Sequence, residues 1–116
     1  MIDKRSAMRL QRDLRFLRRT WIEWGQWQEP ALPDAIGFMV TEAAETMEAW
    51  LRTKAGYTRN NPRPGVLHDI AIEAFDTMLM ACVVLDALGE SLEAIAEEKL
   101  WEMNEKRRVR RNENGH

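Results

Sequence analysis

The segment IAIEAFDTMLMACVVLDAL, residues 70–88, limits the fold of this chain more than any other stretch. Its apolar side chains fall on nearly every side of a helix, which predicts a helix buried over most of its surface. Glu73 and Asp76 interrupt this pattern and lie within about 60° of each other around the helix axis. The face that they share begins at Asp69 and continues with apolar residues: Met80, Val83, Val84 and Ala87. Because an ionised carboxylate is costly to bury unpaired, we expect a positive charge beside Glu73 and Asp76.

Two helices are expected before this segment. Apolar residues recur at helical spacing ahead of Gly25, at Leu10, Leu14, Leu17, Trp21 and Trp24. This pattern predicts an amphipathic first helix with its arginines on the other side. Asp34 is expected to cap a second helix over residues 35–54. The Gly, Asn and Pro residues clustered in 55–65 predict a loop.

The third helix, residues 66–88, contains the apolar segment and is expected to stop at Gly89. The sequence SLEA from Ser91 is a capping pattern that predicts a fourth helix, which ends near Arg110. No stretch alternates with period two for long enough to be a strand. The sequence therefore predicts an all-α protein, a four-helix bundle-like protomer.

Length, composition and cysteine content predict a single cytoplasmic domain. A chain of 116 residues with 45 % hydrophobic residues suits one core, over residues 1–112, with a disordered tail at 113–116. Cys82 is the single cysteine and lies in an apolar run, which indicates a reduced core residue and favours the cytoplasm. The charged N-terminus lacks a signal-peptide core, and the most apolar window, residues 77–85, is too short to span a membrane. No membrane partner is expected.

The charges are distributed unevenly along the chain. The formal net charge is −2, but residues 1–19 and 106–111 are basic and the middle is acidic. Either the basic end helices pair with acidic neighbours, or the acidic middle binds divalent metal. The run KRRVRR at 106–111 falls near the end of a helix, where cations suit the helix dipole, so nucleic-acid binding is not expected.

A second pair of carboxylates lies in VTEAAETMEAW, residues 40–50. Glu42 and Glu45 are one helical turn apart, and apolar residues line the opposite side of the same helix: Val40, Ala44, Met47 and Leu51. By itself this periodicity predicts a solvated acidic face. Two antiparallel helices with acidic residues at i and i+3 can instead present four carboxylates to one pocket. Glu48 lies further round the helix and is expected on the surface.

Carboxylate oxygens without His or Cys favour a hard cation, so Mg²⁺ is the expected cofactor and Mn²⁺ the alternative. A di-iron site is the rival, but it uses Glu-x-x-His pairs. Neither His68 nor His116 follows a Glu by three residues. We therefore expect His68 to be a cap or surface residue.

The order of these motifs along the chain indicates a family. EAAE from Glu42 to Glu45 is followed, after a spacer of 27 residues, by EAFD from Glu73 to Asp76 and then by the helix EKLWEMNEKRR. The chain resembles the MazG-like all-α nucleoside triphosphate pyrophosphohydrolases, whose signature is E-E-x-x-E followed after a spacer by E-x-x-D. The similarity covers residues 21–107, and WQEP at 27–30 is similar to the Trp and Pro of relatives in the deoxycytidine triphosphate branch.

The resemblance implies hydrolysis between the α- and β-phosphates of a (deoxy)nucleoside triphosphate, which releases a nucleoside monophosphate and pyrophosphate. Glu42, Glu45, Glu73 and Asp76 would hold Mg²⁺ and form the catalytic site, with Glu42 or Glu45 as a candidate general base. Thr41 stands at the first Glu of the signature, so one candidate ligand is absent from this chain.

Residues outside the acidic motifs are candidates for binding the nucleotide. Lys99 falls on the apolar stripe of the fourth helix, made by Leu92, Ile95, Ala96 and Met103. It would contact a phosphate or a carboxylate, or direct its ammonium outward to solvent. Asn104 and Arg107 follow near the same side, although Asn104 is five residues after Lys99 where relatives have four.

Aromatic residues are candidates for stacking on the base. Trp21 and Trp24 extend the core stripe of the first helix, whereas Trp27 and Trp50 lie at segment ends and are the expected stacking residues. The loop 55–65 either closes over a nucleotide or only connects two helices.

Two further expectations concern alternatives and assembly. The alternative to an enzyme is a non-catalytic regulatory or nucleotide-binding helical protein on the same scaffold. The apolar third helix has more surface than three neighbouring helices cover, which predicts a homodimer or homotetramer. The family resemblance implies the same, with sites near subunit junctions.

Overall fold

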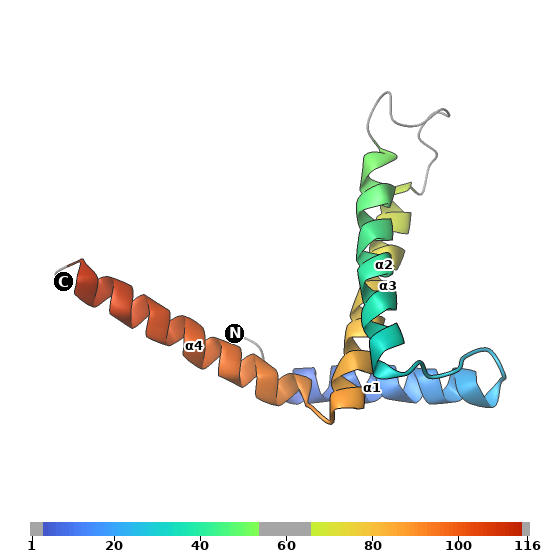
Figure 1. The fold of residues 1–116 in the computed structure, drawn as a ribbon, viewed down its shortest axis with the longest axis horizontal. Coiled ribbons are helices and arrows are strands. Elements are labelled where there is room, and N and C mark those ends of the chain that lie inside the picture. Colours follow the sequence, from blue (N-terminus) through green and yellow to red (C-terminus); the bar gives the residue numbers. More distant parts are fainter. Residues whose placement is uncertain (1–3, 54–65, 115–116) are drawn as a thin grey trace.

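The computed structural model describes residues 4–53 and 66–114. Within these ranges the protein has four helices and no strand (Figure 1): α1 Lys4–Glu23, α2 Leu32–Leu51, α3 Val66–Leu88 and α4 Leu92–Glu113. The prediction of an all-α protein is confirmed. The loop expected at 55–65 and the last two residues of the expected tail lie outside the described residues. Among the described helices, none is long and apolar enough to cross a membrane.

Two glycines end helices α1 and α3 in the same way. Gly25 and Gly89 have φ angles of 72° and 70°, a left-handed conformation that glycine adopts without steric cost. The residue after each glycine donates its N–H to the carbonyl five residues earlier, at 2.8 Å beyond Gly25 and 2.9 Å beyond Gly89. Ser91 then caps α4, since its hydroxyl accepts the N–H of Ala94 at 3.0 Å. The boundaries predicted at Gly89 and Ser91 are confirmed.

The start of α2 differs from the prediction. The helix begins at Leu32, and its N-cap Ala31 makes no side-chain hydrogen bond. Pro33 lies in the first turn, where its fixed φ suits a helix and its missing N–H costs nothing. Asp34 is therefore a first-turn residue that faces the positive end of the helix dipole, and the prediction that it caps the helix is wrong. At the other end of the chain, α4 continues to Glu113, three residues beyond its expected end.

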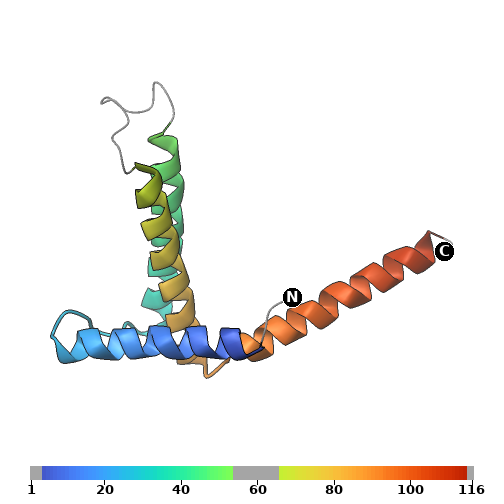
Figure 2. The same cartoon turned by 180° about the vertical axis from the view of Figure 1, so that it is seen from behind.

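The helices do not close around one core. Helices α2 and α3 form an antiparallel hairpin, α1 crosses its base, and α4 leaves the base and points away (Figures 1 and 2). Helix α4 packs on α1 rather than along the hairpin. The radius of gyration is 18.6 Å, whereas a compact domain of this length has about 13 Å. The described helices thus form an open arrangement, with α1 across the base of the hairpin and α4 extending away from it.

The small core lies where α1 and the α1–α2 connection meet the hairpin. One buried cluster joins Leu14 of α1 to Leu79 and Cys82 of α3, with Trp21 and Trp27 packed against it. A second joins Ala35 of α2 to residues of α3, namely Met80 and Val83. These contacts confirm that the face begun by Glu73 and Asp76 continues as core through Met80, Val83 and the half-buried Val84. Ala87 is exposed, so the prediction that the core extends to this residue is wrong. Cys82 is buried, as predicted, and burial raises the pKa of its thiol.

Some expected core positions are exposed because the protomer is open. Trp24, predicted on the core stripe of α1, is 66 % exposed at the last turn before Gly25. In α4, the first residues of the apolar stripe are half-buried against α1, but Met103 is exposed. The prediction that this stripe faces inward along the whole helix is wrong, because α4 separates from the other helices after its first turns.

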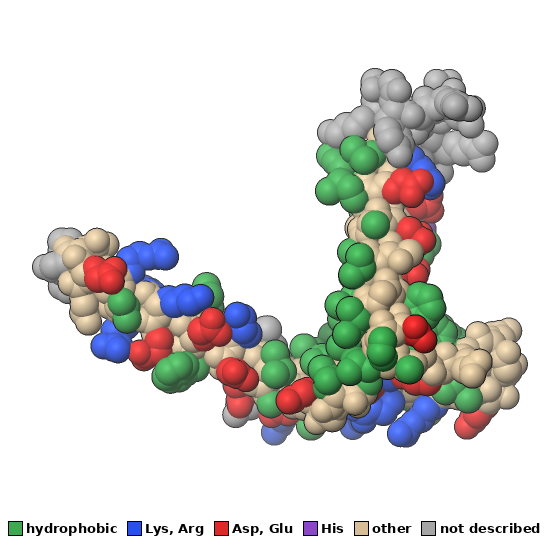
Figure 3. Space-filling model, viewed as in Figure 1, with side chains coloured by type: hydrophobic (Ala, Val, Ile, Leu, Met, Phe, Trp, Pro, Cys, Tyr) green, Lys and Arg blue, Asp and Glu red, His purple; other side chains and the backbone are tan. Residues whose placement is uncertain are grey.

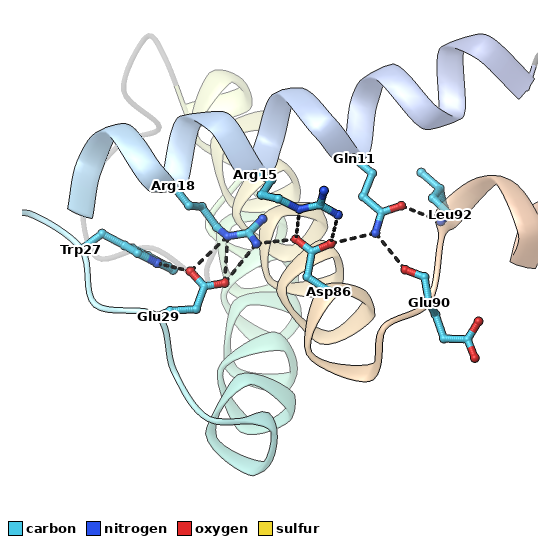
Figure 4. A network of polar contacts seen from close by, with 8 residues as sticks. All are labelled: Gln11, Arg15, Arg18, Trp27, Glu29, Asp86, Glu90 and Leu92. Atoms are coloured by element: carbon cyan, nitrogen blue, oxygen red, sulfur yellow. Dashed lines mark hydrogen bonds and ion pairs between the residues drawn. The ribbon is translucent and has the colours of Figure 1, made fainter. Parts of the chain in front are cut away.

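A buried polar network fixes α1 on the hairpin (Figure 4). The carboxylate of Asp86 accepts hydrogen bonds from Arg15 at 2.6 Å, Arg18 at 2.5 Å and Gln11 at 2.8 Å. Burial alone would raise the pKa of Asp86, but these three donors hold it at about 2. The Gln11 amide oxygen also accepts the N–H of Leu92 at 2.7 Å, which ties the start of α4 to α1. This network joins α1 to the end of α3 and to the start of α4.

Candidate metal centre

Three carboxylates converge between the two helices of the hairpin. Glu42 comes from α2, and Glu73 and Asp76 come from α3. Each offers one oxygen, and these oxygens all lie within 4.8 Å of one another. All three residues are half-buried. Such a cluster of partly buried oxygens can ligate one hard divalent cation.

Among the described residues, one oxygen of Glu42 and one of Glu73 lack the hydrogen-bond partners that buried polar atoms normally have. Oε2 of Glu42 and Oε2 of Glu73 are inaccessible to solvent, and neither has a hydrogen-bond partner within the part of the chain that the structure describes. A buried acceptor without a partner destabilises the fold. Two such oxygens beside a third carboxylate fit the oxygen ligand set of Mg²⁺ or Mn²⁺.

Burial and the neighbouring carboxylates raise the pKa values of these acids. Burial, followed by the charges of Glu45 and Asp76, raises the pKa of Glu42 to about 7. Burial and the neighbouring Glu45 also raise the pKa values of Glu73 and Asp76. Without a cation, the cluster therefore holds protons at a pH where separate carboxylates would be ionised.

Small residues and a pair of threonines bring the two helices together at this point. Ala35 and Ala49 are buried on the α2 face that meets α3 and let the helix axes approach. The hydroxyls of Thr46 and Thr77 lie 3.5 Å apart across the hairpin. Each also donates to a backbone carbonyl four residues earlier, that of Glu42 at 2.9 Å and that of Glu73 at 3.0 Å. The threonines thus link the register of the helices to the placement of the acids.

The α2 face that meets α3 is not the apolar one. Val40 and Met47 are 62 % and 58 % exposed, and Leu51 is also exposed. The periodicity of α2 alone predicts that the side with Val40 is buried and that the acidic side faces solvent. This prediction is wrong for Val40, which is exposed, and for Glu42, which is half-buried. Glu42 instead shares its side of α2 with the buried Ala35 and points to α3.

The fourth predicted ligand and an open groove lie beside the cluster. Glu45 is exposed, yet close enough to act electrostatically on all three clustered carboxylates. A groove of about 350 Å³ starts there, and its polar lining comes from Glu45, Glu48, Arg52, Asp69 and Glu73. Arg52 pairs with Glu48 at 2.6 Å.

Two of the groove residues are not among the predicted site residues: Arg52 has no role in the sequence interpretation, and Asp69 appears there only as the start of the face that Glu73 and Asp76 share. Arg52 is four residues after Glu48 and seven after Glu45, a spacing that places all three on one side of α2. Asp69 is seven residues before Asp76 and shares its face. These spacings are the signals in the sequence that could have identified both residues.

Thr41, at the first position of the resembled signature, lies outside the cluster. Its side chain is exposed, and its hydroxyl donates to the carbonyl of Gly37 at 3.1 Å. The hydroxyl is thus occupied by the backbone of its own helix.

The structure does not bring the predicted phosphate-binding residues to the cluster within one protomer. Lys99, Asn104 and Arg107 are exposed on α4, which runs away from the hairpin (Figure 1). The ammonium of Lys99 lies 3.4 Å from the Glu102 carboxylate on its own helix.

The two predicted stacking residues lie in different places. Trp27 packs in the core at the base of the hairpin, with its ring centre 5.9 Å from that of Trp21. Its indole N–H donates to Glu29 at 3.0 Å, so both its ring and its polar atom are used structurally. Trp50 is exposed on the Val40 and Met47 side of α2.

The metal-free protein is expected to lose stability as pH rises. The pKa of Glu42 is raised to about 7 on folding, so the folded protein binds more protons than the unfolded chain between about pH 4.5 and 7. Stability from this source is present below pH 4.5 and lost as pH rises to 7. The melting temperature in a chelator should fall by several degrees between pH 5 and pH 8. Saturating Mg²⁺ should remove this fall in melting temperature, and the Glu42→Gln variant should show a smaller fall. An equally steep fall in this variant would show that Glu42 is not the group whose protonation stabilises the metal-free protein.

No protein-family model, curated protein or solved structure matches this chain.

Proposed function

We propose that this protein is a Mg²⁺-dependent nucleoside triphosphate pyrophosphohydrolase, which cleaves between the α- and β-phosphates of a (deoxy)nucleotide. One observation carries the proposal: three carboxylates converge between α2 and α3, and two of their buried oxygens have no partner among the described residues. Such a cluster can hold a divalent cation in place of protons, and a cation held by carboxylates on one side can bind phosphate oxygens on the other. The resemblance of the acidic motifs to the MazG-like enzymes supports the same reaction.

Glu42, Glu73 and Asp76 would hold Mg²⁺, or Mn²⁺ in its place, and Glu45 would complete the set from the edge of the groove. A triphosphate carries about four negative charges and would be repelled by these acids alone. When bound, the metal neutralises that charge and activates a water for attack on phosphorus. Glu45 is exposed beside the cluster and is the better placed of the two candidate bases to accept a proton from that water.

The open groove would receive the rest of the nucleotide. Arg52 lies at its edge and would contact a phosphate after exchanging its pairing with Glu48. Lys99, Asn104 and Arg107 would reach the nucleotide only from a neighbouring protomer, consistent with a homodimer or homotetramer. We propose a cytoplasmic location, because Cys82, the single cysteine of the chain, is a buried free thiol.

The decisive measurement is product formation by the purified protein from a panel of ribo- and deoxynucleoside triphosphates, with Mg²⁺ or with a chelator. We expect equal amounts of nucleoside monophosphate and pyrophosphate from at least one nucleotide, and a loss of about 10³-fold without metal. Release of a nucleoside diphosphate and phosphate would show cleavage at a different bond and contradict the proposal.

A second candidate is a nucleotide-binding protein without catalysis. The position of α4 favours it, because Lys99 pairs with Glu102 and lies away from the cluster. Calorimetry that shows Mg²⁺-dependent nucleotide binding, together with no product after long incubation, would select this alternative.

A further inference from the structure

The outer side of α1 carries a row of arginines that none of the other described helices covers. The row consists of Arg5, Arg9, Arg12 and Arg19, with Phe16 among them. Steps of three, four and seven residues connect these positions and keep their side chains on one face of the helix. All five residues are exposed, and Phe16 is 72 % exposed. This surface is here called the arginine face.

The arginine face points away from the rest of the protein. The opposite side of α1 holds its buried residues, among them Ala7, Leu14 and Arg18. At 100° per residue, these three lie about 160–180° around the helix from Phe16. Figure 2 shows α1 in front of the hairpin, with no other helix in front of α1. Figure 3 shows Lys and Arg side chains along the lower edge of α1, below the hairpin. The arginine face is therefore open to a partner.

The positive charge of this face is little compensated within the described part of the chain. Arg12 lies 3.9 Å from Asp13 in an exposed pair, which neutralises it only weakly. Arg9 and Arg19 form no ion pair with any described carboxylate. Glu23 lies on the same side of α1 only at its C-terminal end. Because Arg9 and Arg12 are three residues apart, their like charges are neighbours on the helix surface and repel each other. A bound polyanion would remove this repulsion.

The residue types on the arginine face fit a nucleic-acid strand. Guanidinium groups donate paired N–H bonds to phosphate oxygens and stay charged at physiological pH. An exposed aromatic ring among such cations offers a stacking surface for an unpaired base. From Arg9 to Arg19 the helix is about 15 Å long, enough for a few nucleotides. We propose that the arginine face binds single-stranded nucleic acid. Its arginines contact the phosphates, and a base stacks on Phe16.

A lipid membrane is a poorer partner for this surface. A helix that lies in a membrane interface buries a broad apolar face among the lipids. The apolar side of α1 instead packs in the core through Leu14 and Trp21, and Phe16 is the one apolar residue of the arginine face. The run at 106–111, from which the sequence predicts no nucleic-acid binding, lies on α4 and is not part of this face.

Fluorescence anisotropy with a labelled single-stranded oligonucleotide tests the proposal on the full chain. A chelator prevents the carboxylate cluster from binding phosphate through a metal. Three phosphate contacts predict that the logarithm of the association constant falls with the logarithm of the salt concentration with a slope of about −2. Arg9→Gln/Arg19→Gln should reduce this slope to about −0.7 and weaken binding at low salt at least about tenfold. The matched control Arg108→Gln/Arg111→Gln removes the same charge from exposed positions of α4 and should change neither the slope nor the affinity.

Phe16→Ala separates base stacking from charge. This variant should bind the oligonucleotide at least about fivefold more weakly than the unmodified protein does. Both proteins should bind an abasic strand of the same length with equal affinity, because that strand has no base to stack. Phe38→Ala, at an exposed position of α2, should bind both strands as the unmodified protein does. All the substituted side chains are exposed, so the variants should keep the fold, which their melting temperatures check.

Three results would overturn the proposal. The first is equal weakening by the two double variants, and the second is a loss of affinity by Phe16→Ala that is the same for both strands. The third is binding to vesicles of anionic lipid without binding to the oligonucleotide at low salt. These measurements involve no turnover, so an active protein that does not bind the strand would contradict the arginine face alone. An inactive protein that binds the strand would contradict the proposed hydrolase alone.

Discussion

Glu73→Gln is expected to lower Mg²⁺-dependent pyrophosphate release by at least about 10³-fold, because an amide is a poor substitute for an anionic ligand in a site of three carboxylates. The same change should raise the melting temperature of the metal-free protein. Glu73 has a buried oxygen without a described partner and a pKa raised by burial and by Glu45, so its negative charge opposes folding. Loss of activity together with a gain in stability is typical of a substitution at a ligand site. If Glu73 had only a structural role, the Glu73→Gln protein would lose both activity and stability.

Three measurements check this expectation: initial rates of pyrophosphate release, Mn²⁺ binding followed by electron paramagnetic resonance, and melting in a chelator. Glu98→Gln makes the same chemical change at an exposed position of α4 and should leave all three unchanged. Retention of activity and metal affinity by Glu73→Gln would remove the proposed centre. Retention of metal affinity with loss of activity would instead place Glu73 in contact with substrate.

Asp86→Asn is expected to destabilise the fold by about 3 kcal/mol, because it leaves the buried guanidinium of Arg18 with the more exposed Glu29 as its remaining described charge partner. The side chain of Arg18 is 3 % exposed, and its Nη2 lies 2.5 Å from Asp86 and 3.0 Å from Glu29. Urea unfolding at a fixed protein concentration measures the difference, since association would otherwise add to it. Asp13→Asn is the matched control: Asp13 is exposed and 3.9 Å from Arg12, so its loss should change stability by less than about 0.5 kcal/mol.

The pH dependence of this effect has the opposite sign to that of Glu42. The pKa of Asp86 is lowered to about 2 on folding, so its contribution is present above about pH 4 and lost as pH falls toward 2. The difference in stability between the unmodified protein and Asp86→Asn should therefore shrink from pH 5 to pH 3. A constant difference over this range would show that the charge of Asp86 is not what stabilises the α1 contact.

Local sequence patterns were sufficient to predict the helices and most of their ends. Gly89 ends α3 and Ser91 caps α4 because each acts through its own backbone and the adjacent turn. The same patterns mispredicted the start of α2, where Asp34 has the chemistry of a cap but Pro33 favours an earlier first turn. A helix that begins at Leu32 and one that begins after Asp34 differ little in free energy. The local sequence alone does not show which start is favoured.

The candidate site was predictable in part. The i, i+3 spacing of Glu73 and Asp76 on an apolar helix was enough to predict that they share a face with the core. The same spacing of Glu42 and Glu45 could not decide which of them joins the cluster, since the two lie about 60° apart on α2. Glu42 lies on the same side of α2 as the buried Ala35 and Ala49, whose small side chains leave room for α3, and it therefore joins the cluster.

The sequence by itself determined four helices, an acidic pair on each of two, and an apolar stripe on each of the same two. These are properties of helical periodicity, which acts over a few residues. Only the tertiary structure decided that α2 turns its Glu42 face to α3, that its Val40 face is left uncovered, and that α4 extends away from the site. Those choices depend on contacts between residues far apart in the chain, such as Thr46 with Thr77 and Gln11 with Asp86, and no local pattern encodes them.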